Sequence, residues 1–242
     1  MPQIMQALTV PTLLVVGDER LKEWTPSSRH AGTWQVTKRV DIEGSLTRIG
    51  AIVREELEQD TAMAIQAILI VGLNYELLYR TIHENEAIYL KLSSDPSVSD
   101  IYNIASSLDK SWRSRRQLTV MWALPAPPNF LKFNCIMAER QGVTLSKFDK
   151  TECIGMEEMF REVVKHIHRR FSIQKLLMHP LREAPRGERD NGIIARKETI
   201  AYIMHDILSA LVAQVPQERP TILGRYRTSD TDHFATSGKA TV

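Results

Sequence analysis

The sequence has little of what marks several protein classes. Its 242 residues include only two cysteines, Cys135 and Cys153, too few for a disulfide framework and without the spacing of a metal site. No apolar run approaches the ~18 residues that a membrane-spanning helix needs. The apolar N-terminus lacks a basic segment and a small-residue cleavage site, so it is predicted to be a first strand and not a signal peptide. These absences predict a soluble, cytoplasmic chain with free thiols and no membrane partner.

Charge of either sign is balanced over the whole chain but uneven along it. The 31 Lys and Arg against 29 Asp and Glu give a net charge of +2. Between residues 161 and 197, ten Lys and Arg stand against four acidic residues, a local balance of 10 − 4 = +6. This asymmetry permits an anionic partner such as RNA.

Short apolar runs alternate with helical patterns. Residues 12–16, 67–71 and 118–124 are rich in Val, Ile and Leu and end at turn residues, as strands buried on both faces do. A weaker run, residues 33–40, alternates as an edge strand does. Helical spacing of apolar residues predicts helices over 45–59, 76–92, 100–116, 130–141, 156–170 and 196–212. A last strand is predicted over 173–178, with 143–148 as the alternative.

This order predicts a three-layer α/β/α fold with a parallel sheet. We expect one domain over residues 1–214, with a polar loop at 181–192 and a flexible tail at 215–242. Ligands of such sheets bind beyond the carboxyl ends of the strands.

The residues at those strand ends resemble the motifs of the SGNH (GDSL-like) hydrolases. Gly17-Asp18-Glu19 follows the first strand, Gly72-Leu73-Asn74 follows another, and Asp190 precedes the final helix. The resemblance spans roughly residues 12–212. It implies that Gly72 and Asn74 correspond to elements of the family's oxyanion hole. A different doubly wound fold, such as a flavodoxin-like one, is the alternative.

Two positions depart from the family pattern. Glu19 stands where the family has its nucleophilic serine, and Ile193 stands where its histidine base follows the late aspartate Asp190. Neither can take the role of the residue it replaces. The resemblance therefore implies an inactive hydrolase and not an enzyme. It also extends to the esterase-like domains of retrotransposon proteins and to the inactive C-terminal domain of Oskar, a germ-plasm (germ granule) protein implicated in RNA binding.

Three functions are compatible with this reading. The first is a binding module for single-stranded RNA, with Trp112 stacking on a base and basic residues on the phosphates. The alternative for these residues is a solvated helix surface and a core tryptophan. The candidate residues are Lys110, Arg113, Arg115, Arg116, Arg169, Arg170, Lys175, Arg182, Arg186 and Arg189.

The second function is a scaffold for protein partners. Its tail carries Ile222, Leu223, Tyr226 and Phe234, which could dock on a partner. The third is a hydrolase with an altered active site, where Asp18, Glu19 and Asn74 meet at the strand ends. Asp18 is alternatively a helix cap and Glu19 an exposed side chain. No cofactor and no metal site is predicted.

Overall fold

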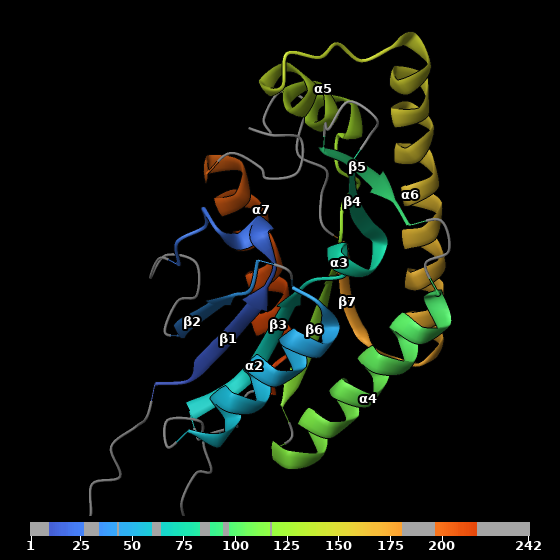
Figure 1. The fold of residues 1–242 in the computed structure, drawn as a ribbon. Coiled ribbons are helices and arrows are strands. Elements are labelled where there is room, and N and C mark those ends of the chain that lie inside the picture. Colours follow the sequence, from blue (N-terminus) through green and yellow to red (C-terminus); the bar gives the residue numbers. More distant parts are fainter. Residues whose placement is uncertain are drawn as a thin grey trace, which may run out of the picture.

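A parallel five-stranded sheet forms the centre of the fold, as the alternating pattern predicted (Figure 1). The computed structural model describes residues 10–26, 34–42, 44–59, 64–82, 88–93, 97–116, 118–180 and 197–216. The strand order is β2-β1-β3-β6-β7, and each neighbouring pair is parallel. The strands are β1 (Thr12–Gly17), β2 (Gln35–Val40), β3 (Ile65–Val71), β6 (Thr119–Leu124) and β7 (Leu177–Pro180). The predicted α/β fold class is confirmed.

Helices cover both faces of this sheet (Figure 1). On one face lie α2 (Leu46–Glu58), α4 (Val98–Arg116) and the C-terminal part of α6 (Lys147–Ile173). The other face is covered by α7 (Lys197–Gln214). In β1, Leu14 and Val16 pack on the first side and Leu13 and Val15 on the second. Because both faces are buried, the strand reads as a continuous apolar run.

Trp112 of α4 lies in the core and not on a binding surface. It is 3% exposed, and its ring stacks on that of Trp122 in β6 with centroids 6.1 Å apart. Trp122 in turn meets the edge of Phe171 in α6 at 6.0 Å. The suggestion that Trp112 stacks on an RNA base is therefore wrong, and the core alternative is confirmed.

The predicted helix over residues 76–92 is also wrong. The structure has one short helix, α3 (Asn74–Leu77), and then an antiparallel hairpin of β4 (Leu78–Ile82) and β5 (Ile88–Leu92). With α5 (Phe130–Arg140) and the first half of α6, this hairpin stands beyond the carboxyl edge of the sheet (Figure 1). The hairpin forms in place of the predicted helix because α5 and α6 pack against it. Tertiary packing of this kind overrides a local helical pattern.

Some helix boundaries differ from the predicted ones because capping residues determine where a helix begins. Ser146 and Asp149 form a capping box that starts α6, so the alternative strand at 143–148 does not form. The same helix continues to Ile173, and the last strand begins at Leu177 and not at residue 173. Ser97 Oγ accepts the Asp100 N–H at 3.2 Å and caps α4, which begins at Val98 and not at residue 100 as predicted.

Two further expectations concern the limits of the fold. No helix in the described part of the chain is long and apolar enough to cross a membrane. The polar loop at 181–192 lies outside the described residues, as does nearly all of the tail at 215–242.

Candidate functional site

A pocket opens at the carboxyl ends of β1 and β3, where the strand-end motifs were expected to meet. Its volume is about 430 Å³. The loops after β1, β2 and β3 and the hairpin all contribute to it. The lining residues are Asp18, Glu19, Ile42, Asn74, Tyr75, Leu78, Tyr79, Arg80 and Leu90. The predicted convergence of Asp18, Glu19 and Asn74 is confirmed.

Asp18 serves the architecture of this pocket. Its carboxylate accepts Arg20 Nε at 2.8 and 3.1 Å and Arg20 Nη2 at 2.8 Å, and its Oδ1 also accepts the Arg20 N–H at 3.0 Å. Arg20 Nη2 donates to Gly72 O at 2.6 Å as well. The pair is buried, with the Asp18 side chain 1% exposed and the Arg20 side chain 9% exposed. The predicted cap is confirmed, and the guanidinium neutralises the carboxylate and joins the ends of β1 and β3.

A metal ion at Asp18 would have to displace Arg20. Arg20 occupies both carboxylate oxygens of Asp18. Across the described ranges, no three His, Cys, Asp or Glu side chains gather as metal ligands would.

Glu19 faces the hairpin across the pocket. Arg80 Nη2 of β4 lies 3.4 Å from its Oε1 and 3.3 Å from its Oε2. The Glu19 side chain is 22% exposed and that of Arg80 54%. Both distances exceed the 2.7–2.9 Å that is typical of a charge-assisted hydrogen bond. Glu19 is therefore a solvent-accessible carboxylate in a loose ion pair, and not simply an exposed side chain.

Asn74 enters the pocket through an unusual backbone turn. Leu73 before it has a φ of 78°, in the left-handed region that a leucine rarely adopts. This turn starts α3 and places Asn74, which is 8% exposed, on the pocket wall. The amide Oδ1 is enclosed without a hydrogen-bond partner in the described structure. The amide NH₂ is then the end of this side chain that the pocket can present.

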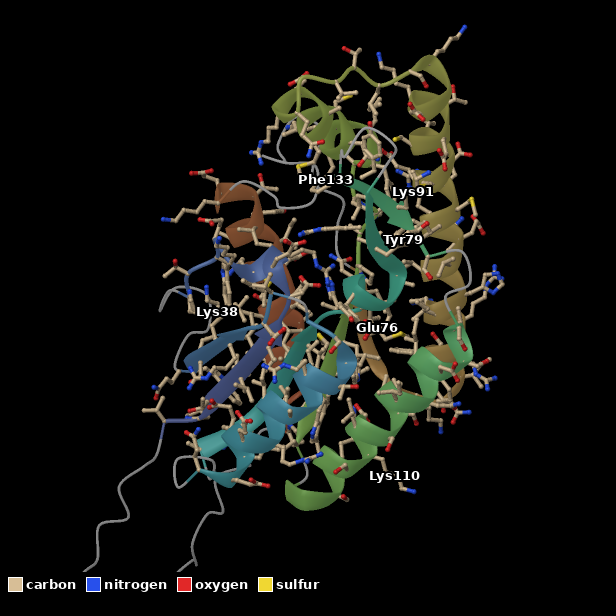
Figure 2. All side chains as sticks on the ribbon, in the orientation of Figure 1. Lys38, Glu76, Tyr79, Lys91, Lys110 and Phe133 are labelled. Carbon is tan, nitrogen blue, oxygen red and sulfur yellow. The ribbon has the colours of Figure 1, made fainter. Side chains whose placement is uncertain are left out.

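Glu76 of α3 (Figure 2) carries a partly buried carboxyl two residues after Asn74, which lines the pocket. Its Oε1 accepts the Leu46 N–H at the start of α2 at 2.7 Å. Burial raises the pKa of Glu76 above its ordinary value, and the nearby Asp18 carboxylate raises it further, against two backbone hydrogen bonds that lower it. Compared with the unfolded chain, the folded state therefore favours the protonated carboxyl of Glu76. The stability that this protonated carboxyl contributes to the fold is full below the ordinary glutamate pKa and declines as the pH rises through the raised pKa.

Gly44 brings a loop against the floor of the site. Its φ is +61°, and a Cβ there would lie 2.4 Å from Asp18 Cβ. Its N–H donates to Asp41 Oδ1 at 2.9 Å. Only glycine fits this close approach without strain.

Sequence reasoning missed Arg20, Gly44, Glu76 and Arg80. Arg20 follows Asp18 by two positions, and that spacing is a signal for a local ion pair. Arg80 was hidden by the helix predicted over 76–92, although Tyr79, Thr81 and Ile82 are residue types that favour strands.

The predicted RNA-binding residues are only partly brought together. Arg169 and Arg170 are exposed near the end of α6, and the Arg170 guanidinium lies 4.9 Å from the ring centroid of Tyr102 in α4. Lys110 points away from α4 into solvent (Figure 2). Arg113 instead binds Asp109 at 2.7 Å and Val120 O at 3.0 Å, a structural role. Lys175 is exposed just after α6, with a φ of 58°.

The other candidates fall outside what the structure describes. The side chains of Arg115 and Arg116 are not described, and Arg182, Arg186, Arg189, Asp190 and Ile193 lie between the described segments. The tail residues Ile222, Leu223, Tyr226 and Phe234 lie beyond the last described residue.

Solved structures share this fold. No family model and no curated protein sequence matches the chain. A GDSL-like lipase from Bacteroides thetaiotaomicron superposes with a TM-score of 0.51 at 9% identity, over 84% of this chain and 88% of the lipase. Est24, a carbohydrate acetylesterase from Sinorhizobium meliloti, superposes with a TM-score of 0.52 at 11% identity, over 84% of this chain and 99% of the acetylesterase. An aryl esterase from M. smegmatis superposes with a TM-score of 0.52 at 10% identity, over 84% of this chain and 99% of the aryl esterase. The chain has the fold of the SGNH hydrolases.

This comparison corrects one expectation. The strand-end motifs predict a protein that is not an enzyme, but the three solved structures named above, which share its fold, are a lipase and two esterases. The expectation rested on Glu19 in place of a serine and on Ile193 in place of a histidine, and it did not include the pocket and the arginine beside Glu19.

Proposed function

We propose that this chain is a hydrolase with an altered active site, in which Glu19 activates water to cleave an ester. The observation that carries the proposal is the shared pocket of Glu19 and Asn74 at the carboxyl edge of the sheet. Its volume of about 430 Å³ falls in the range of small-molecule sites, and it is mostly apolar with a few convergent polar groups, as such sites are.

The reaction needs one base and one donor to the developing oxyanion. Glu19 takes a proton from a water molecule whose oxygen attacks the acyl carbon. The Asn74 NH₂ donates to the carbonyl oxygen as it gains negative charge. When the tetrahedral intermediate collapses, the ester C–O bond breaks and Glu19 returns the proton to the leaving oxygen. Ester and water thus yield acid and alcohol, and no covalent enzyme intermediate is formed.

The walls of the pocket indicate the size and polarity of the substrate. Ile42, Tyr75 and Tyr79 are exposed at 70%, 54% and 45%, and they line the pocket together with Leu78 and Leu90. Such walls suit a short acyl chain or an aromatic ring. Acetyl and aryl esters, the substrate types in the names of two proteins of the same fold, are therefore the first to test.

The Glu19→Gln variant tests the proposal directly. Glutamine keeps the shape of the side chain but cannot accept a proton from water, so hydrolysis of 4-nitrophenyl acetate is expected to fall about 100-fold or more. Release of 4-nitrophenolate measures the rate. The matched control is Glu55→Gln on the exposed face of α2, which is expected to retain the wild-type rate. Wild-type protein without turnover of acetyl or aryl esters, or a fully active Glu19→Gln variant, would contradict the proposal.

A second candidate function is RNA binding on the surface of α4 and α6. Arg169, Arg170 and Lys110 are exposed there, and none of them forms an ion pair with another described residue. Tyr102 holds one face of the Arg170 guanidinium and leaves its edge for a phosphate. This surface supports electrostatic contact with a phosphate backbone.

Charge reversal checks this second candidate. The double variant Arg169→Glu, Arg170→Glu is expected to weaken binding of single-stranded RNA at least about tenfold and to reduce its salt dependence. Fluorescence anisotropy at two salt concentrations measures both quantities. Arg54→Glu on α2 is the control. Equal affinity of the double variant and the wild type would exclude this surface.

A further inference from the structure

One wall of the pocket is a hairpin that presents a single cation. In the register of β4 and β5, Arg80 lies opposite Leu90, and Leu78 lies opposite Leu92. Alternate residues of a strand share one face, so Leu78, Arg80 and Leu90 face the same side, and all three line the pocket. Arg80 is the one Lys or Arg among the described residues that line it.

Contacts with α5 and α6 hold the hairpin in place. Asn134 of α5 uses both ends of its amide on the outer edge of β5, where Oδ1 accepts Leu90 N–H at 2.7 Å and Nδ2 donates to Leu90 O at 3.1 Å. Lys91, which lies opposite Tyr79 in the hairpin (Figure 2), binds Glu152 of α6 at 2.8 Å. These contacts hold the strand that carries Leu90, and through its pairing they hold Arg80.

The Arg80 guanidinium is incompletely used. One nitrogen, Nη2, reaches Glu19 at 3.3 and 3.4 Å, and neither Nε nor Nη1 donates to another described residue. An arginine has five N–H donors in a planar fork that matches a carboxylate. The side chain is 54% exposed, so a ligand in the pocket can reach it.

The charge count favours a singly charged anion. Arg20 already neutralises Asp18, which leaves Glu19 and Arg80 as the charged pair at the pocket. When a ligand carboxylate binds the Arg80 guanidinium, the ligand, Glu19 and Arg80 together carry one net negative charge. With a doubly charged phosphate in its place they would carry two, and the Glu19 carboxylate would repel the phosphate more strongly.

We propose that Arg80 recognises a carboxylate on the substrate, so that the preferred substrates are esters whose acyl chain ends in a carboxylate. This inference rests on the proposed hydrolase function of the same pocket. Binding of the substrate carboxylate to Arg80 draws the guanidinium away from Glu19, and Glu19 is then free to accept a proton from water. Arg80 acts as a specificity residue and, through Glu19, as a positioning residue.

The test compares a carboxylate ligand with its neutral counterpart. N-Phenylsuccinamic acid and butyranilide are stable amides that differ by a carboxylate in place of a methyl group. Titration calorimetry is expected to show that the wild type binds the acid at least about tenfold tighter. Arg80→Gln is expected to lose this preference and Arg80→Lys to keep part of it. Arg54→Gln, on the exposed face of α2, is the control and is expected to keep it.

The readouts separate this inference from the proposed function. An Arg80-dependent preference for the acid supports the inference even if the protein hydrolyses neither 4-nitrophenyl hemisuccinate nor 4-nitrophenyl butyrate, and in that case the hydrolase proposal alone fails. Hydrolysis of both esters with equal kcat/KM in the wild type and in Arg80→Gln overturns the inference and leaves the hydrolase proposal standing. A wild type that binds neither amide also overturns the inference.

Discussion

Replacing Gly17 with alanine is expected to destabilise the fold by about 3 kcal/mol. Gly17 is the last residue of β1, and a Cβ there would lie 2.4 Å from Val71 O and 2.7 Å from Leu21 Cδ1. The carbonyl cannot move freely, because Val71 O accepts the Asp18 N–H at 3.0 Å. The alanine must therefore separate the ends of β1 and β3 or break this hydrogen bond. Urea unfolding followed by circular dichroism measures the loss.

Gly155→Ala supplies the contrast. Gly155 lies inside α6, and a Cβ there meets nothing within 4 Å. Alanine has the higher helix propensity, so this variant is expected to gain about 0.5–1 kcal/mol in the free energy of unfolding. If Gly17→Ala were as stable as the wild type, the close approach of β1 and β3 beneath the pocket would be wrong.

Arg20→Met is expected to cost about 3–5 kcal/mol in the free energy of unfolding. Methionine fills much of the volume but leaves the Asp18 carboxylate, 1% exposed, without its partner. The Gly72 carbonyl also loses its donor. A buried charge without a partner is far more costly than the pair itself is stabilising. The same urea titration measures this change.

An exposed ion pair gives the matched control for Arg20. Arg48 binds Asp41 at 3.2 Å, and its side chain is 62% exposed, so Arg48→Met is expected to cost less than about 1 kcal/mol. Adding Asp18→Asn to Arg20→Met removes the unpaired charge and is expected to recover part of the lost stability. A loss in Arg20→Met no larger than that in Arg48→Met would show that the buried pair does not hold the site together.

The central sheet was predictable because its signal is local. The runs that became β1, β3 and β6 are apolar on both faces, and each ends at turn residues. Parallel strands bring their carboxyl ends to one edge, which is why Asp18, Glu19 and Asn74 could be placed together before the structure was known.

The hairpin was not predictable in the same way. Its stability depends on Asn134, which is 44 residues away from Leu90 in the sequence. Residues 76–92 contain enough helix formers to satisfy a helical pattern, and nothing within them reports the contact with α5. The local pattern therefore predicted a helix where tertiary packing forms two strands.

The functional interpretation went wrong for a related reason. Inactivity was inferred from the identities of two residues, Glu19 and Ile193, whereas Arg80, the partner of Glu19, comes from a strand 61 residues after it. With the hairpin assigned as a helix, no cation was expected at the pocket. Taken alone, Glu19 was interpreted as the loss of a serine, whereas the proposed hydrolysis depends on this carboxylate together with Arg80 in the pocket.

The amide of Asn134 has a consequence beyond the pocket wall. By meeting both the N–H and the C=O of Leu90, it imitates the backbone of a neighbouring strand. An unsatisfied strand edge is a template on which another chain can add a strand and aggregate. The contact that fixes Leu90 thereby also occupies the N–H and C=O that an added strand would need at this position.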